Sequence, residues 1–100
     1  MQEYKIVLTK SASKNLDQIA LYIKENDSEY SAAKVIKKIH HKINSLNYFP
    51  KRKRILGYSK IFWMVHTGKY NILYTINDRH KTVNIFRIMF AAQDYTRFLK

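Results

Sequence analysis

The hydrophobic residues near the start of the chain change their spacing once. Tyr4, Ile6 and Leu8 alternate with polar positions, and this period of two predicts a short β-strand. Over residues 11–25 the spacing becomes i, i+3, i+4, i+7, which predicts an amphipathic helix. Its apolar side consists of Leu16, Ile19, Ala20 and Ile23.

A second amphipathic helix is predicted after a polar break at residues 26–28, where Asp27 or Ser28 can cap its first turn. Phe49 and Pro50 end this helical region. Because the link between the two helices is short, we expect an antiparallel hairpin whose apolar seams face each other. The seam of the second helix consists of Ile36, Ile39, Ile43 and Leu46.

The period returns to two beyond residue 60, and three strands are predicted at residues 61–65, 70–76 and 82–90. The polar segments 66–69 and 77–80 are typical of short turns that join such strands into a meander.

The last of these strands is apolar on both faces, so we expect it near the middle of a sheet that is covered on both sides. Strict alternation would give one face to Val83, Ile85 and Met89, and the other to Phe86, Ile88 and Phe90. A short helical turn is predicted after it, at residues 94–99. The resulting order, β-α-α-β-β-β-(α), predicts an α+β fold in which an N-terminal helical hairpin packs on a small antiparallel sheet, as one domain over residues 1–100.

Acidic residues are absent between Tyr30 and Asn77, whereas Lys and Arg recur throughout that stretch, and the formal net charge is +12. Such an imbalance favours a polyanionic partner: nucleic acid, a nucleic-acid-bound machine or an acidic protein. A solvated lysine-rich surface is the alternative interpretation. A predicted basic loop at the centre of the stretch contains Lys51, Arg52, Lys53 and Arg54.

Composition disfavours several other classes of protein. The chain has no cysteine, and its N-terminal apolar patch is too short for a signal peptide or a membrane span, so a cytoplasmic location is expected. Glycine occurs only at Gly57 and Gly68, which excludes a glycine-rich phosphate loop, and no cofactor is expected. His40 and His41 are adjacent on a helix and diverge by about 100°, so no metal site is expected.

Arg87 interrupts an otherwise apolar strand, where a guanidinium is costly unless it meets an anion. Its partner is predicted to be Asp17, Asp94 or a backbone carbonyl, with a ligand phosphate as the alternative. The aromatic residues Trp63, Tyr70 and Tyr74 are expected to lie in the core or on a sheet face rather than to stack on bases.

Over nearly its whole length the chain resembles the RelE/ParE superfamily of type II toxin–antitoxin toxins. The resemblance is carried by the order and spacing of several segments. These are Ile6-Val7-Leu8-Thr9, Ala12 with Leu16-Ile19-Ala20-Tyr22-Ile23, Ile43-Asn44-Ser45-Leu46 with Phe49-Pro50, Lys69-Tyr70-Asn71-Ile72-Leu73-Tyr74, and Ile85-Phe86-Arg87-Ile88 with Gln93-Asp94.

The resemblance implies a growth-inhibitory toxin that is neutralised by a cognate antitoxin with an acidic, partly disordered tail. It also implies that the antitoxin supplies the DNA-binding domain through which the pair reaches operator DNA. A basic toxin suits such an acidic tail.

The branch of the superfamily decides whether the protein is an enzyme. RelE-type toxins cut mRNA on the ribosome with lysines on the first strand of the meander, an arginine after the tyrosine of a Gly-Tyr-Arg motif, and a C-terminal arginine and tyrosine. In this chain only Tyr95 has a counterpart in that set. The other positions hold Phe62, Met64, Asn71, Ala91 and Ala92. This departure favours the ParE branch, whose members bind DNA gyrase without chemistry of their own.

Three functions stay open from the sequence. The first is a ParE-like toxin that binds its target or antitoxin through Lys51, Arg52, Lys53, Arg54, Lys60, Arg87 and Arg97. The second is a ribosome-dependent mRNA interferase with a substituted active site, drawn from Lys60, His66, Arg87 and Tyr95. The third is a plain nucleic-acid-binding module.

Overall fold

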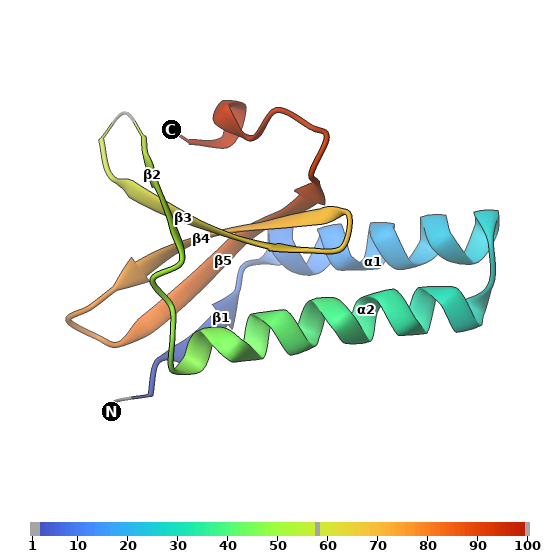
Figure 1. The fold of residues 1–100 in the computed structure, drawn as a ribbon, viewed down its shortest axis with the longest axis horizontal. Coiled ribbons are helices and arrows are strands. Elements are labelled where there is room, and N and C mark those ends of the chain that lie inside the picture. The colour runs from blue at the N-terminus through green and yellow to red at the C-terminus, as the bar shows by residue number, and fades with distance from the viewer. Residues whose placement is uncertain (1–2, 58, 100) are drawn as a thin grey trace.

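The computed structural model describes residues 3–57 and 59–99, in which a helical hairpin packs on one face of a twisted sheet (Figure 1). The predicted α+β class is confirmed. The elements in chain order are β1 (Lys5–Leu8), α1 (Lys10–Asn26), α2 (Glu29–Asn44), the 3₁₀ helix η1 (Ser45–Asn47), β2 (Lys53–Leu56), β3 (Ile61–Thr67), β4 (Tyr70–Asn77), β5 (Thr82–Phe90) and the 3₁₀ helix η2 (Tyr95–Phe98). No helix in these described ranges is both long enough and apolar enough to cross a membrane.

Each long helix begins at a hydroxyl side chain that accepts a hydrogen bond from its first turn. Thr9 Oγ1 accepts from the Ala12 amide at 3.2 Å, and Ser28 Oγ accepts from the Ser31 amide at 3.0 Å. Ser28 is therefore the cap of α2, whereas Asp27 closes α1 by donating its amide to the Ile23 carbonyl at 2.8 Å. Such caps typically stabilise a helix by about 1 kcal/mol, and here they limit the link between the helices to two residues.

The sheet has five strands in the order β1-β5-β4-β3-β2. It is a mixed sheet, so the prediction of an antiparallel sheet is wrong for one strand pair. β1 pairs in parallel with β5, while the other three pairings are antiparallel. A parallel pairing needs a long connection, and here the helical hairpin and the strands β2 to β4 all lie between β1 and β5 in the chain. The expected inner position of β5 is confirmed, because it has a strand on each side.

The alternation predicted for the two faces of β5 is wrong, because a β-bulge shifts the register of the strand. Leu73 pairs with Arg87, but the next residue of β4, Tyr74, pairs with Ile85. Phe86 is thus the extra residue, and beyond it every side chain changes face. Ile88 consequently joins the helix-facing core, while Met89 packs on the opposite face.

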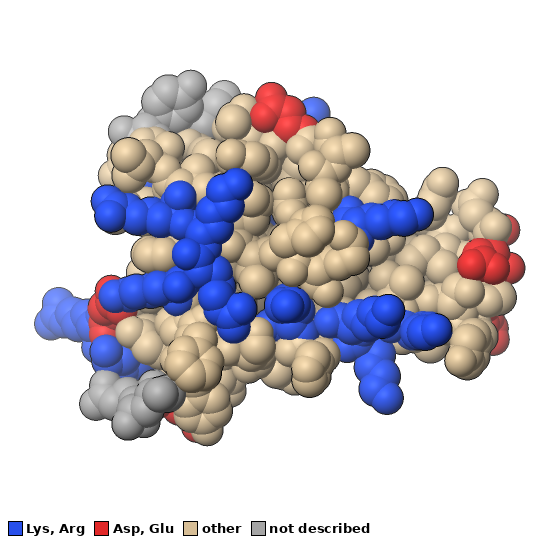
Figure 2. Space-filling model, viewed as in Figure 1, with Lys and Arg blue, Asp and Glu red and all other residues tan. Residues whose placement is uncertain are grey.

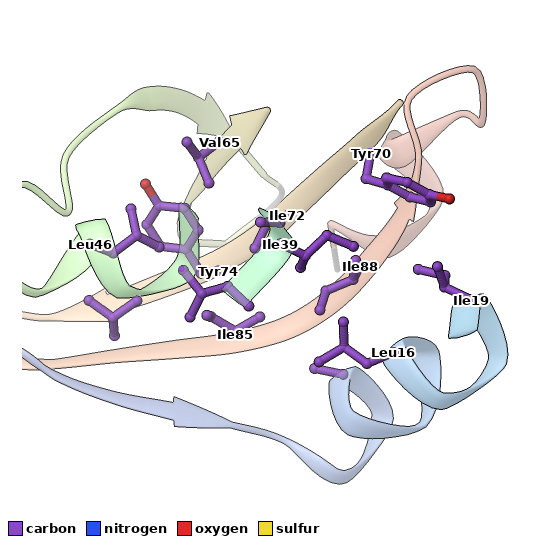
Figure 3. Packing of buried hydrophobic residues seen from close by; sticks show 13 residues of the cluster. Leu16, Ile19, Ile39, Leu46, Val65, Tyr70, Ile72, Tyr74, Ile85 and Ile88 are labelled. Atoms are coloured by element: carbon purple, nitrogen blue, oxygen red, sulfur yellow. The ribbon is translucent and has the colours of Figure 1, made fainter. Parts of the chain in front are cut away.

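The main core lies between the sheet and the helical hairpin, and Figure 3 shows its side chains filling that space. The predicted seams are confirmed: both helices contribute their i, i+3, i+4 apolar positions, and full burial of each Leu or Ile stabilises the fold by about 1.5–3 kcal/mol. The buried members are Ala12, Leu16, Ile19, Ile39, Ile43, Leu46, Val65, Tyr70, Ile72, Tyr74, Val83, Ile85 and Ile88.

A smaller apolar cluster covers the other face of the sheet. Met64, Leu73 and Met89 are buried there beneath Tyr95 and other residues of the C-terminal segment. The predicted C-terminal turn is present as η2, whose first turn is capped by Asp94. β5 is therefore covered on both faces, as its composition predicts.

Two local predictions need correction. The segment predicted as a basic loop is a loop only in part, because Lys53 and Arg54 open the edge strand β2. A short edge strand rich in cations is a common protection against edge-to-edge pairing, and it lacks the apolar alternation that would predict it. β3 also runs through His66 and Thr67, so the turn to β4 is only Gly68 and Lys69, with Gly68 at φ +57°.

Candidate functional site

The cationic residues 51–54 are held in different ways. Lys51 Nζ lies 3.6 Å from Asp78 Oδ2, in an exposed ion pair. Arg52 is anchored at the end of the helical hairpin, where its Nη2 donates to Ser45 Oγ at 3.0 Å and its Nε donates to the Phe49 carbonyl. The other two residues of the cluster are exposed on β2.

Positive charge gathers on the face that displays α2 and β2. Figure 2 shows blue atoms running along α2 and across to β2, with red atoms toward the edges of the view. Among residues 3–57 and 59–99 the ion pairs are Lys24 with Glu29 and Lys51 with Asp78. Most of the positive charge on this face is therefore left for an external anion.

A groove of about 570 Å³ runs between the helical hairpin and the turn from β3 to β4. Its floor is aromatic: the Phe90 ring lies 6.3 Å from the Tyr22 ring and 5.2 Å from the Tyr70 ring. Burial, followed by the neighbouring Tyr22, raises the pKa of Tyr70, so its phenol stays protonated near neutral pH. The rim carries three cations, Lys34, Lys38 and Lys69, and one carboxylate, that of Asp27.

This groove has the character of a binding site for an amphipathic acidic segment, since an apolar floor and a cationic rim lie side by side. Sequence reasoning missed it, because its residues come from α1, α2, β4 and β5. The only signal in the sequence was that the chain has more large apolar and aromatic side chains than its core buries, so that some of them lie on the surface. Tyr22 is 58% exposed and Phe90 is 39% exposed.

The four residues considered for a nuclease share one side of the sheet but are separated by apolar side chains. Lys60 Nζ lies 5.5 Å from the centre of the Phe62 ring, at one margin of the smaller cluster. Tyr95 packs within that cluster. Arg87 lies over the Phe98 ring at 4.0 Å, so the guanidinium meets an aromatic face rather than the predicted Asp17, Asp94 or carbonyl.

His66, the fourth of these residues, is tied to a buried amide. Its Nδ1 lies 2.9 Å from Asn71 Oδ1 on the adjacent strand, where the two residues are directly paired. Since the amide oxygen of Asn71 can only accept, Nδ1 is the donor in this bond, and Nε2 faces away from Asn71. Asn71 is one of two buried polar residues in the described structure, and its role was not predicted.

A second hollow, of about 340 Å³, lies where α1, β5 and the C-terminal segment meet. Arg87 and Arg97 line it together with Gln18 and Gln93, and it can therefore present two guanidinium groups to an anion. Its inner wall includes Asn15, the other buried polar residue, whose Oδ1 accepts from the Ile88 amide at 3.0 Å. The sequence held one signal for this hydrogen bond: an asparagine lies next to Leu16 on the apolar side of a helix, where a polar side chain needs a buried partner.

The prediction that Trp63, Tyr70 and Tyr74 lie in the core or on a sheet face is confirmed. Tyr70 and Tyr74 are buried, and Trp63 packs half-buried against the main core. These rings therefore contribute to folding rather than forming an exposed stacking platform.

Comparison with known proteins places this geometry in a family. Over residues 6–95 the chain matches the family described as the ParE toxin of the type II toxin–antitoxin system, parDE. The chain belongs to the ParE toxin family. The resemblance to the RelE/ParE superfamily that the sequence indicated is thus confirmed, and the ParE branch fits. No curated protein matched the chain in sequence.

Solved structures share the fold of this ParE-family chain. The chromosomal ParDE toxin–antitoxin system from P. aeruginosa aligns with a TM-score of 0.75 and 15% identity, covering 88% of this chain and 96% of that one. The RelBE2 toxin–antitoxin complex from Mycobacterium tuberculosis aligns at 0.65 with 25% identity, covering 93% and 97%. The archaeal RelE–RelB complex from Pyrococcus horikoshii OT3 aligns at 0.66 with 14% identity, covering 93% and 100%.

Proposed function

We propose that this toxin inhibits growth by binding DNA gyrase, without chemistry of its own. The proposal rests on one observation: the positions of the sheet at which RelE-type toxins carry catalytic lysines are apolar in this chain. Those positions hold Phe62 and Met64, which are 2% and 6% exposed, and the position of the expected arginine holds buried Asn71. Without those cations, little remains to stabilise the charge of a developing phosphorane.

We further propose that a cognate acidic antitoxin holds the toxin inactive and carries it to operator DNA. The groove with its aromatic floor and its rim of Lys34, Lys38 and Lys69 would receive the apolar side of the antitoxin tail. Residues 51–54, Lys60, Arg87 and Arg97 are candidates for contacts with its carboxylates or with the target. The similar solved structures of ParDE, RelBE2 and RelE–RelB are named as toxin–antitoxin systems or complexes, which supports this assembly.

The deciding experiment adds the purified toxin to gyrase and plasmid DNA, and in parallel to ribosomes programmed with mRNA. The proposal expects that supercoiling is blocked, or cleaved plasmid is trapped, while the mRNA stays intact. Cleavage of mRNA in the ribosomal assay with unaffected gyrase would overturn it. A short adjacent gene encoding an acidic protein of DNA-binding type is the corresponding expectation for the antitoxin.

A RelE-like endoribonuclease with a substituted site is the second candidate, and one observation favours it. The bond from His66 to Asn71 holds the imidazole in one orientation, as a general base requires. If mRNA is cut, His66→Ala and Arg87→Ala should each lower the cleavage rate by at least about 100-fold. Equal rates in the variants and the parent would remove these residues from the active site, and would leave Lys60 and Tyr95 to be tested in the same way.

A further inference from the structure

The exposed side of α2 carries a continuous basic stripe, which we define as Lys34, Lys37, Lys38, His41 and Lys42. Their spacing of i, i+3, i+4, i+7 and i+8 places them along one side of the helix. This side lies opposite the buried Ile39 and Ile43. We propose that the basic stripe binds the phosphate backbone of duplex DNA directly, without an intermediary protein.

The stripe continues beyond the end of α2 through a contact made by Arg52. The next position on the same side of the helix is Ser45, and Arg52 Nη2 donates both to its Oγ at 3.0 Å and to its carbonyl at 3.4 Å. Lys53 and Arg54 follow on β2. Figure 2 shows the result as blue atoms that run from α2 across to β2.

The length of this surface suits several phosphates. Eleven residue steps separate Lys34 from Ser45, and a rise of about 1.5 Å per residue makes the helical part about 16 Å long. B-form DNA carries about one charge per 1.7 Å of its axis when both strands are counted, so roughly ten phosphates surround a stretch of that length, and several of them face the stripe. Lysines with long, flexible stems can reach them without a fixed register.

Polar chemistry distinguishes the stripe from the groove proposed for the antitoxin. The described residues that line the hollow along the stripe are all polar: Lys34, Lys37, Lys38, His40, His41, Lys42, Asn44 and Thr67. A disordered acidic segment that folds on binding needs apolar anchors, which the groove offers and this hollow lacks. Phosphates need only cations and donors, which the stripe supplies.

The form of the nucleic acid follows from two features of the stripe. Its hollow has no Phe, Tyr or Trp among the described lining residues, whereas proteins that bind single strands use such rings to stack on bases. The cations lie on a helix, which can reach the phosphates on both walls of the wide major groove of B-form DNA, whereas the narrow, deep major groove of an RNA duplex does not admit a helix. Both features favour duplex DNA.

Lys34 and Lys38 also belong to the groove rim, so the test avoids them. The stripe variant combines Lys37→Gln, Lys42→Gln and Lys53→Gln. A matched control removes the same charge from the N-terminal elements, with Lys5→Gln, Lys10→Gln and Lys14→Gln, all exposed positions. Circular dichroism and thermal unfolding of both variants establish that each is folded.

The probe is a short labelled DNA duplex of arbitrary sequence, which is titrated with antitoxin-free toxin at several salt concentrations. Fluorescence anisotropy of the probe gives the affinity and its salt dependence. The slope of log Kobs against log salt should fall by about 3 in the stripe variant, because each phosphate contact contributes about 0.9, and by much less in the control. Equal slopes in the two variants, no binding to the duplex, or tighter binding to a single strand or an RNA duplex would each overturn the proposal. Binding is measured without gyrase, so a negative gyrase assay leaves this result intact.

Discussion

Tyr74 shows at the level of one residue how the sheet is tied to the end of the helical hairpin. Its side chain is completely buried, and its hydroxyl donates to the carbonyl of buried Pro50. Burial raises the pKa of Tyr74 to about 12, although the nearby Arg52 acts in the opposite direction. The protonated phenol is therefore favoured in the folded chain.

This shift predicts a loss of stability at alkaline pH. Since the folded pKa lies above the ordinary value of 10.0, the stabilisation is complete below about pH 10 and is lost as the pH rises to about 12. The free energy of unfolding, measured by urea denaturation across this range, should fall by on the order of 2 kcal/mol from this group alone.

The control for that measurement is Tyr74→Phe, which removes the titrating group but leaves every other tyrosine and lysine in place. The difference between the free energies of unfolding of the parent and the variant at each pH isolates the contribution of Tyr74. This difference should become smaller as the pH rises. Parallel curves from pH 10 to 12 would show that Tyr74 does not couple to folding in this way.

The edge of β5 illustrates how elements are joined. β1 pairs with β5 only as far as Ile85, and beyond that point the free edge of β5 meets α1. Asn15 projects from α1 and accepts the Ile88 amide, so a side chain replaces the missing strand. A buried amide without such a partner costs about 1–3 kcal/mol.

Asn15→Leu should therefore destabilise the protein by about 1–3 kcal/mol while keeping the size of the side chain. Chemical denaturation measures the change. Lys14→Ala, at the exposed neighbouring position, is the control and should stay within about 0.5 kcal/mol of the parent. A neutral Asn15→Leu would mean that water or a shift of α1 satisfies the Ile88 amide.

Element prediction succeeded where the pattern was local. The period of 3.6 and the polar break at residues 26–28 were enough to place both helices, and Ser28 was among the predicted caps. Prediction failed for β2, whose four residues all pair with β3 although they show no alternating apolar pattern. It also failed at Phe86, because a bulge depends on the partner strand rather than on β5 itself.

At the scale of the whole molecule, two kinds of surface lie on adjoining sides of α2. The groove combines apolar floor and basic rim, while the basic stripe is polar throughout. The two surfaces overlap at Lys34 and Lys38, whereas Lys37 and Lys42 belong to the stripe alone. An antitoxin tail in the groove and DNA on the stripe would therefore compete for the two shared lysines.

The groove predicts a specific effect of Tyr22 on antitoxin affinity. Tyr22→Ala removes an exposed ring that packs on Phe90, and should weaken binding by about tenfold or more, because buried aromatic anchors dominate such interfaces. Calorimetric titration with the cognate antitoxin measures the change.

Tyr30→Ala is the matched control for that titration, since Tyr30 is a tyrosine that is 77% exposed at the start of α2. The affinity of the Tyr30→Ala variant for the antitoxin should stay within about twofold of the parent's affinity. If Tyr30→Ala weakens binding as much as Tyr22→Ala, the antitoxin occupies a different surface from the groove.

The two helices, the strands of the meander and the excess of positive charge were predictable from the amino-acid sequence alone. They depend on periods, caps and compositions that act within a few residues along the chain. The superfamily was indicated instead by a resemblance in the order and spacing of segments over nearly the whole chain, and the family match over residues 6–95 bears it out. Four features became known from the three-dimensional structure: the parallel pairing of β1, the face of Arg87, the bond from His66 to Asn71 and the link from Arg52 to Ser45. Each of these depends on pairing register and on contacts between separate elements, which no local pattern specifies.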